Sequence, residues 1–456
     1  MNVVATTYSY PQLLRPPASL LETWDRRLAS LGAIMVLLLT THAFQFLFAD
    51  KISDGLVEQE TAQNSPAYFA FVAAQCGLFF FLLLWNVLLS GVSKRLALVL
   101  LISAFVLLSA TWSNDPKTTV LDGILFTYMA VSAFVLSIYF HPKRFLRLYV
   151  NFGAAMIVAS FVLYAILPES AVEPRTIGDP LSVPLFRGVF VSKNSAGMLF
   201  ASFFLIALMG RGLGLPSLYR WLVVAASLAG IMLADSMTAL AVGLLLATGW
   251  WLIGSLSLHR RILYYLAFCL ALAFVVAVPF ADLGNSDLGL LGRDTTFTGR
   301  DEVWRQAISA ISERPVLGYG YDAFFSGDPF SPAWKFWENF RYFLTSSFHN
   351  SAIDVTVSLG LVGLLILMLV CLIAGSVVFN QTLPPQLPEL LLLLLAAFIL
   401  ESSMEFAIFH HNNVATMVLF YTFFCAGHRY RLPLYAPHNH QAIPAAPSPR
   451  TFRQLH

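Results

Sequence analysis

Charged side chains are scarce in this sequence. Only 11% of its 456 residues are Asp, Glu, Lys or Arg, whereas an ordinary soluble domain has about 25%. A soluble chain of this length would have too few charges to cover its surface, which excludes a soluble enzyme, a nucleic-acid-binding protein and a disordered protein. The formal net charge of +2 also indicates that no polybasic patch for nucleic acid or lipid predominates.

Cysteine is equally rare. The four cysteines each lie within an apolar run, and none is spaced as a Cys-x-x-Cys pair: Cys76, Cys269, Cys371 and Cys425. We therefore expect small lipid-facing or helix-facing side chains, and neither a zinc site nor a disulfide framework.

Apolar residues make up 58% of the chain, with 39 Phe, and the mean hydropathy is +0.72. A spanning helix needs about 20 mostly apolar residues, and the sequence contains twelve such runs. It predicts an all-α, polytopic membrane protein with about twelve transmembrane helices. The runs are 28–49, 67–92, 96–114, 122–140, 148–168, 194–210, 217–234, 237–257, 262–280, 351–378, 388–408 and 411–427.

Lys and Arg occupy every second short loop, and the intervening loops are acidic or mixed. By the positive-inside rule both termini are then cytoplasmic, and no cleavable signal peptide is expected before the first span. The basic positions are Arg15, Arg26, Arg27, Lys94, Arg95, Lys143, Arg144, Arg147, Arg211, Arg220, Arg260, Arg261, Arg429 and Arg431. The predicted regions are a cytoplasmic segment 1–27, nine spans in 28–280, an outer loop 281–350, three spans in 351–427 and a disordered cytoplasmic tail 428–456.

The first long outer loop, 169–193, ends in two basic residues. Arg187 and Lys193 lie just outside the predicted sixth span, where Asn194 and Ser195 are candidates to cap the helix. A helix N-terminus there would favour an anion. Considered alone, the two basic residues are more typical of side chains that extend to lipid headgroups.

The second long outer loop, 281–350, contains an apolar stripe at helical spacing. Val303, Trp304, Ala307, Ile308 and Ile311 follow Arg300, and Thr298 or Asp301 is a candidate start for the helix. We expect this amphipathic helix to lie at the membrane interface with Arg300 at its N-terminal end. The outer loops contain no Asp-x-Asp pair, so we expect neither a metal ion nor another cofactor.

A Gly-rich turn and many aromatic residues follow this helix. Pro315 to Tyr321 contains a Gly-x-Gly sequence that could cradle phosphate, although the pattern is weak. The aromatic residues between 319 and 348, including Tyr319 and Tyr321, suit either sugar stacking or an interfacial belt.

Histidines end two of the outer loops. His349 and Asn350 precede the tenth span, where a histidine can exchange a proton near neutral pH or cap a helix. Asp354 lies one turn further on, and either it or a carboxylate of the loop is a candidate to orient His349. His410 and His411 occupy a short outer loop and are less favoured as residues of the site.

Taken in order, these motifs resemble the O-antigen ligase and polymerase superfamily, and within it the exopolysaccharide polymerases. They are Arg187-Gly-x-Phe-x-x-Lys193-Asn194, Thr298-Gly299-Arg300-x-x-x-Trp304, Pro315-x-Leu-Gly318-Tyr319-Gly320, and His349-Asn350 with Leu359-Gly360-Leu361. Glu401 in the eleventh span fits the family's acidic residue there. The sequence departs at Met237, where relatives often carry Arg.

The resemblance implies a GT-C-like, metal-independent inverting glycosyltransferase on the periplasmic face of the bacterial inner membrane. The implied donor is a glycan on undecaprenyl diphosphate, and the acceptor is another lipid-linked repeat unit or lipid A core. Chain-length regulators and export proteins are further partners of such a role, and nucleic acid is not.

The resemblance also implies roles for single residues. Arg187 and Arg300 would bind the diphosphate, because the planar guanidinium pairs with phosphate oxygens and stays charged. Lys193, Asn194, Tyr319, Tyr321 and Asn350 would bind substrate, and His349 would be the base or position the acceptor.

Three other functions compete with a polymerase. A ligase would use the same donor chemistry with another acceptor. A transporter of lipid-linked glycans would show internal repeats and polar midplane sites, and we find no repeat between the halves. A structural partner in a secretion complex would leave the set of Arg187, Arg300 and His349 unexplained.

Overall fold

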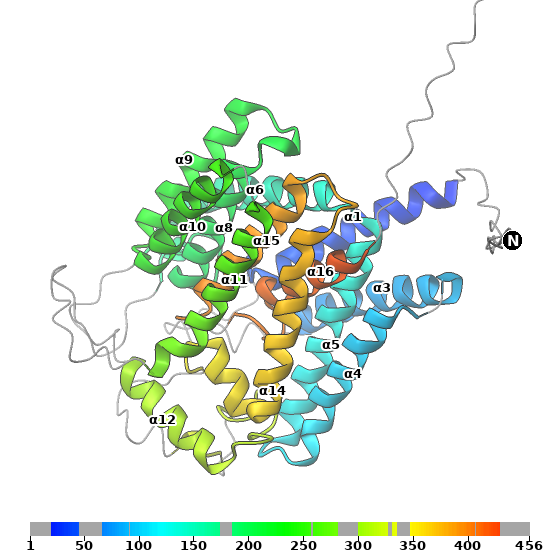
Figure 1. Cartoon of the computed structure of the whole chain (residues 1–456), viewed down its shortest axis with the longest axis vertical. Coiled ribbons are helices and arrows are strands. Elements are labelled where there is room, and N and C mark those ends of the chain that lie inside the picture. The colour runs from blue at the N-terminus through cyan, green and yellow to red at the C-terminus, as the bar shows by residue number, and fades with distance from the viewer. Residues whose placement is uncertain are drawn as a thin grey trace, which may run out of the picture.

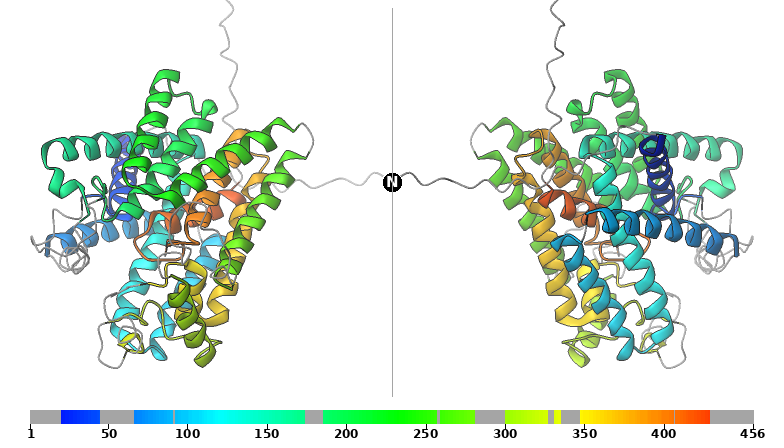
Figure 2. Two further views of the ribbon diagram at one scale, coloured as in Figure 1. Left: turned by 90° about the vertical axis from the view of Figure 1, so that its left-hand side faces the viewer. Right: turned by 90° about the vertical axis from the view of Figure 1, so that its right-hand side faces the viewer.

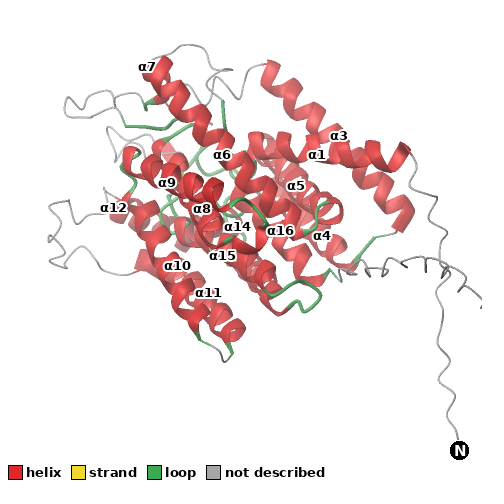
Figure 3. Cartoon of the chain, turned by 90° about the horizontal axis from the view of Figure 1, so that it is seen from above, coloured by secondary structure: helices red, strands yellow, loops and turns green. Residues whose placement is uncertain are grey.

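The computed structural model describes residues 20–44, 66–90, 92–173, 185–256, 259–280, 300–326, 331–334, 347–405 and 407–428. Within these ranges the chain is helical, and its only β-type pairing is an isolated antiparallel bridge between Val172 and Phe186 (Figures 1 and 3). The prediction of an all-helical protein is thus confirmed. The predicted cytoplasmic tail beyond His428 and most of the predicted N-terminal segment lie outside the described residues.

The helices follow the order of the predicted spans. They are α1 (Leu20–Thr40), α3 (Pro66–Ser90), α4 (Lys94–Leu108), α5 (Pro116–Tyr139), α6 (Pro142–Ile166), α7 (Pro168–Ala171), α8 (Lys193–Met209), α9 (Ser217–Leu233), α10 (Met237–Ser255), α11 (Arg260–Ala277), α12 (Arg300–Glu313), α14 (Ser351–Gly375), α15 (Gln386–Glu401) and α16 (Val414–Gly427).

Each of the twelve predicted spans overlaps one of these helices. Seven helical segments are long and apolar enough to cross a membrane, and four shorter apolar helices accompany them. The chain is therefore a multi-pass membrane protein, whereas the count of twelve remains a prediction. The first turns of several helices follow simple capping rules, as where Asp115 accepts the amide of Thr118 ahead of α5.

Three helices form the centre of the molecule. Most side chains of α8 and nearly every side chain of α15 and α16 are buried. Figure 1 shows α15 and α16 between α9–α10 on one side and α3–α4 on the other. The outer helices expose large apolar side chains, such as Leu222 of α9 and Leu245 of α10. In a bilayer such exposed residues face lipid, so the central helices are shielded from it by protein.

The helix α14 is broken at Gly360, which has φ 67° and ψ −168°. This region of backbone conformation is essentially restricted to glycine. The turn after α12 packs against α14 at this break. Figure 2 shows α12 lying beside α14. Three backbone hydrogen bonds join turn and helix: Tyr319 N–H to Val357 O, Gly320 N–H to Ser358 O, and Leu361 N–H to Pro315 O, at 2.9, 2.9 and 2.8 Å.

Gly318 and Gly360 therefore have the same structural role: each lets the backbone of the turn after α12 approach the backbone of α14 closely. A Cβ at Gly360 would collide with the carbonyl of Val316, and a Cβ at Gly318 with that of Val357. The amides of residues 318–321 donate to protein acceptors. They are therefore not available as a phosphate cradle.

We predict that Gly360→Ala destabilises the protein by at least about 1–3 kcal/mol, because alanine does not tolerate this φ and its Cβ meets backbone. Thermal unfolding in one detergent measures the effect. Gly249→Ala is the matched control, since its helical position on α10 has open space around it. Equal unfolding midpoints for the two variants would contradict the role of Gly360.

Candidate active site

Glu405 is the centre of a polar cluster in the loop between α15 and α16. Its Oε1 accepts hydrogen bonds from Arg300 at 2.9 Å and from Asn194 at 2.7 Å, and its Oε2 lies 3.3 Å from His349 Nδ1. Arg300 begins α12, Asn194 lies in the first turn of α8, and His349 precedes α14. One carboxylate therefore joins three segments that are far apart in the sequence.

The cluster keeps Glu405 ionised. Burial raises the pKa of this carboxyl, but the hydrogen bond and charge of His349, the charge of Arg300 and the bond from Asn194 outweigh it. The net effect is a pKa below the usual range. A deprotonated carboxylate facing His349 Nδ1 holds the ring proton on that nitrogen, so Nε2 is the nitrogen that can accept a proton.

The start of α14 fixes the position of His349. Asn350 is the N-cap residue: its Oδ1 accepts the amides of Ala352 and Ile353, and it is fully buried. Asp354 accepts the amides of Phe348 and Asn350 through its two oxygens. Asp354 was a candidate to orient His349, and it does so through the backbone while Glu405 contacts the ring.

Ser351 ties this helix start to the loop that carries Glu405. Its Oγ accepts the amides of Ala407 and Ile408, and its own amide donates to Ser402 O. These bonds hold Glu405 beside His349. The expectation that Asn350 binds substrate finds no support, because both ends of its amide group bond to protein.

The predicted amphipathic helix is α12. Its apolar stripe packs against protein: Val303 and Trp304 are buried, and Trp304 Nε1 donates to Phe348 O at 2.9 Å. The stripe was expected to face the membrane interface. Val303 and Trp304 instead face the interior of the protein. Its packing instead brings Arg300 within reach of Glu405.

Arg187 lies in the loop before α8, and Lys193 begins that helix, whose Asn194 bonds Glu405. Arg187 is 3% exposed and donates to the carbonyls of Ser170 and Val191. Both basic side chains act on the carboxyl of Glu173, whose pKa burial raises while their charges lower it. Glu405 also lies within electrostatic range of Glu173. Glu173 thus connects these two basic residues to the Glu405 cluster.

Ser192, and not the predicted Asn194 and Ser195, caps α8, since its Oγ accepts the Ser195 amide. Asn194 is thereby left to bond Glu405.

Tyr319 and Tyr321 are almost completely buried. The Tyr319 hydroxyl bonds to Ala310 O and to Glu313, and the Tyr321 hydroxyl donates to Phe409 O. These contacts assign both rings to packing between loops. The expectation that they bind substrate finds no support here.

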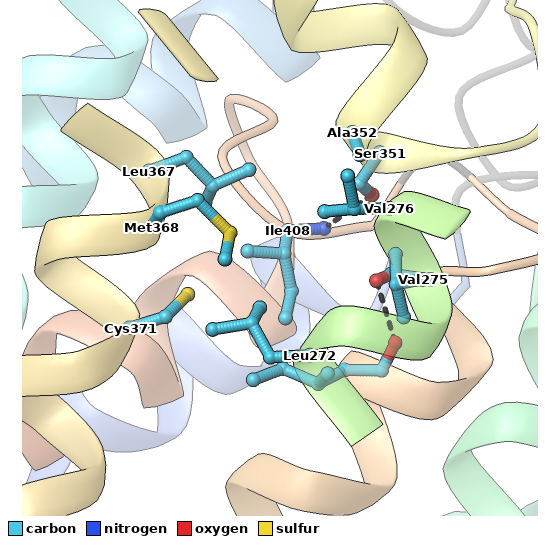
Figure 4. Close-up of a pocket in the computed structure, with 11 residues that line it drawn as sticks. Leu272, Val275, Val276, Ser351, Ala352, Leu367, Met368, Cys371 and Ile408 are labelled. Carbon is cyan, nitrogen blue, oxygen red and sulfur yellow. Dashed lines mark hydrogen bonds between the residues drawn. The ribbon is translucent and has the colours of Figure 1, made fainter. Parts of the chain in front are cut away.

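A small cavity lies elsewhere, between α11, α14 and the loop after α15 (Figure 4). Its lining includes Leu272, Val275, Leu367, Met368, Cys371 and Ile408, and it contains no charged side chain. It is a gap in apolar packing, so it offers no chemistry for a glycan or a phosphate.

Among the described residues, one group of side chains could hold a metal ion. Asp322, His410 and His411 each offer one ligand atom, and these atoms lie within 4.8 Å of one another. None of these three residues is among those that bond Glu405.

Sequence reasoning missed Glu405 and Glu173. The chosen acid, Glu401, ends α15 and is 3% exposed, whereas the acid that contacts Arg300 and His349 follows one turn later. Both glutamates fell within one predicted span. The useful signal was that α15 had to end before the polar run Ser402-Ser403, which would have left Glu405 outside the helix.

These observations define a multi-pass membrane protein with a half-buried cluster of Arg, His and carboxylate groups beside one end of its central helices. A family model described as O-antigen ligase matches residues 221–368, which include Arg300 and His349. This match agrees with the resemblance to the O-antigen ligase and polymerase superfamily that the motifs indicated.

The exopolysaccharide production protein ExoQ of Rhizobium meliloti (strain 1021) is 28% identical to the chain over 282 residues. This match covers 59% of the chain and 62% of the relative, so the chain spans less than two thirds of the relative's length. No solved structure shows a significant match to this chain.

We predict that Arg300 and Glu405 are energetically coupled. A double-mutant cycle on the free energy of unfolding, with Arg300→Ala and Glu405→Ala, should give a coupling of about 0.5–3 kcal/mol. The exposed pair Arg305 and Glu302 on the same helix is the control, and its coupling should not exceed about 0.5 kcal/mol. Equal couplings for the two pairs would contradict the prediction.

The coupling should depend on pH in one direction. Because the pKa of folded Glu405 is depressed, its stabilising effect is present above the ordinary carboxyl pKa of about 4.3. It is lost as the pH falls through the lower folded value. The coupling should therefore stay constant from about pH 8 to pH 5 and decline only below that.

Proposed function

We propose that the chain is a membrane glycosyltransferase of polysaccharide biosynthesis. It polymerises undecaprenyl-diphosphate-linked repeat units on the periplasmic face of the bacterial inner membrane. The observation that carries the proposal is the shared contact of Arg300 and His349 with Glu405. It unites a cation suited to a phosphate with a base suited to a sugar hydroxyl.

The leaving group is the undecaprenyl diphosphate. As the anomeric C–O bond breaks, negative charge grows on the diphosphate, and Arg300, Arg187 and Lys193 are the cations that neutralise it. No metal ion is required at the phosphates in this scheme. Removing one such donor typically costs about 10²–10³-fold in rate.

The acceptor hydroxyl attacks the anomeric carbon from the face opposite the diphosphate, so the configuration inverts. Its proton passes to His349 Nε2, while Glu405 stabilises the resulting imidazolium through Nδ1–H. A positioned base of this kind contributes about 10²–10⁴-fold. Glu405 is thus a positioning residue, and His349 is the catalytic base.

An O-antigen ligase that transfers the glycan to lipid A core is the main alternative, because it needs the same donor chemistry. The name of the relative, an exopolysaccharide production protein, favours the polymerase. A transporter of lipid-linked glycan is a more remote alternative.

We predict that purified protein in liposomes, supplied with undecaprenyl-diphosphate-linked repeat units and no added metal or nucleotide, yields a ladder of longer lipid-linked glycans. Arg300→Ala, Arg187→Ala and His349→Ala should each lower the rate at least about 100-fold. Arg305→Ala is the matched control, since Arg305 is an exposed cation on the same helix as Arg300.

The other outcomes separate the alternatives. Product formed only when lipid A core is supplied identifies a ligase. Glycan that crosses the vesicle membrane without any new linkage identifies a transporter. A wild-type ladder from Arg300→Ala refutes the role given to that residue.

We also predict the orientation in the membrane. In a cysteine-free background, Ser312→Cys on α12 should react with a thiol reagent confined to the periplasm, whereas Lys143→Cys at the start of α6 should not. Both side chains are exposed. The opposite labelling pattern would place the cluster on the cytoplasmic face.

A further inference from the structure

A second polar cluster joins three segments, and the transfer scheme uses none of its residues. Asp322 lies after α12, His410 and His411 lie between α15 and α16, and Asp122 projects from α5. Asp322 Oδ2 is 2.9 Å from His411 Nδ1 and 3.7 Å from His410 Nε2. The two imidazole rings stack with centroids 4.3 Å apart.

Each ring directs one nitrogen to Asp322 and the other to an outer acceptor. His410 Nδ1 donates to the carbonyl of His411 at 2.6 Å, which places the lone pair on the Nε2 that faces Asp322. His411 Nε2 lies 3.5 Å from Asp122 Oδ1. Metal-binding histidines show this arrangement, because an outer acceptor fixes the ring and its tautomer.

The separations also suit a common centre. Metal–ligand bonds of about 2.0–2.1 Å in a tetrahedral site place neighbouring ligand atoms about 3.3 Å apart. The observed 2.9 and 3.7 Å lie on either side of that value. His411 Nδ1 is buried, and despite its 2.9 Å approach to Asp322 it has no hydrogen bond of good geometry among the described residues.

The negative charges of Asp122 and Asp322 would be balanced by a bound cation. Two carboxylates face it, and within the described ranges no Lys or Arg forms an ion pair with Asp122 or Asp322, whereas Glu405 has Arg300. The side chains of Asp322, His410 and His411 are 21, 25 and 14% exposed. An ion from solution can therefore reach them.

We propose that Asp322, His410 and His411 form a binding site for a divalent transition-metal ion of the Zn²⁺ class. The ligand atoms are an Asp322 carboxylate oxygen, His410 Nε2 and His411 Nδ1. Asp122 orients His411 from outside, and the fourth coordination position is left for water or a substrate oxygen. Hard cations such as Mg²⁺ prefer all-oxygen sites and are not expected here.

The site is separate from the proposed transfer chemistry. An ion bound there would join the turn after α12 to the loop between α15 and α16, and through Asp122 to α5. It would thereby stabilise the position of that loop. Binding is measured without any glycan, so failure of this proposal and failure of the transfer scheme can be told apart.

The test uses full-length protein purified through a tag without histidine, with His438, His440 and His456 of the tail replaced by Gln. After treatment with a chelator, the protein is titrated with Zn²⁺, Co²⁺ and Mg²⁺. We expect about one equivalent of Zn²⁺ or Co²⁺, a visible Co²⁺ spectrum of a tetrahedral nitrogen and oxygen site, a higher unfolding midpoint with Zn²⁺, and no response to Mg²⁺.

Variants then assign the ligands. His410→Gln and Asp322→Asn should lose binding, and Asp122→Asn should weaken it by about 10–100-fold, as for an outer-shell partner. His141→Gln, which alters a histidine that caps α6, should bind as the wild type does. Absence of binding by the chelator-treated wild type, a thiolate charge-transfer band with Co²⁺, or unchanged affinity in His410→Gln would each overturn the proposal.

Discussion

The site depends on one carboxylate that serves several partners at once. Glu405 lies half-buried in a short loop between two almost fully buried helices, where an unpaired charge would be costly. Arg300 and Asn194 bond to one of its oxygens, and His349 lies beside the other. Because each partner comes from a different part of the chain, the packing of α8, α12 and α14 around this loop is what makes the charge tolerable.

The two clusters of the loop between α15 and α16 solve the same electrostatic problem differently. Glu405 is balanced by an arginine of the protein itself. Among the described residues the ion-pair partners of Asp122 and Asp322 are histidines, so the balance of their charge depends on a proton or on an ion from outside. The loop therefore has one end whose charge is fixed and one end whose charge depends on what binds.

Much of the helical layout was predictable, because apolar runs and basic loops report directly on spans. The helix at Arg300–Glu313 also followed from its apolar spacing. What the stripe would pack against did not follow, because periodicity shows a face and not its partner. For the same reason Tyr319 and Tyr321 looked like an aromatic surface and are in fact buried between loops.

The residues around Glu405 were only partly predictable. Arg300 and His349 could be chosen from ordered motifs, but no local pattern distinguishes Glu405 from Glu401, which is four positions earlier. The distinction rests on where α15 ends, and helix ends are the least certain part of a prediction from sequence. The grouping of Asp322 with His410 and His411 was equally hidden, since 88 positions separate Asp322 from His410.

The break at Gly360 has a mechanical consequence. Backbone hydrogen bonds join the turn after α12 to α14. We therefore expect α12, which begins with Arg300, and the start of α14, which follows His349, to move as one rigid unit. Their separation is set by these backbone bonds together with the packing of Trp304, whose Nε1 donates to Phe348 O. Any opening of the cluster to admit a bulky glycan must then come from the opposite wall, which is the loop that holds Glu405.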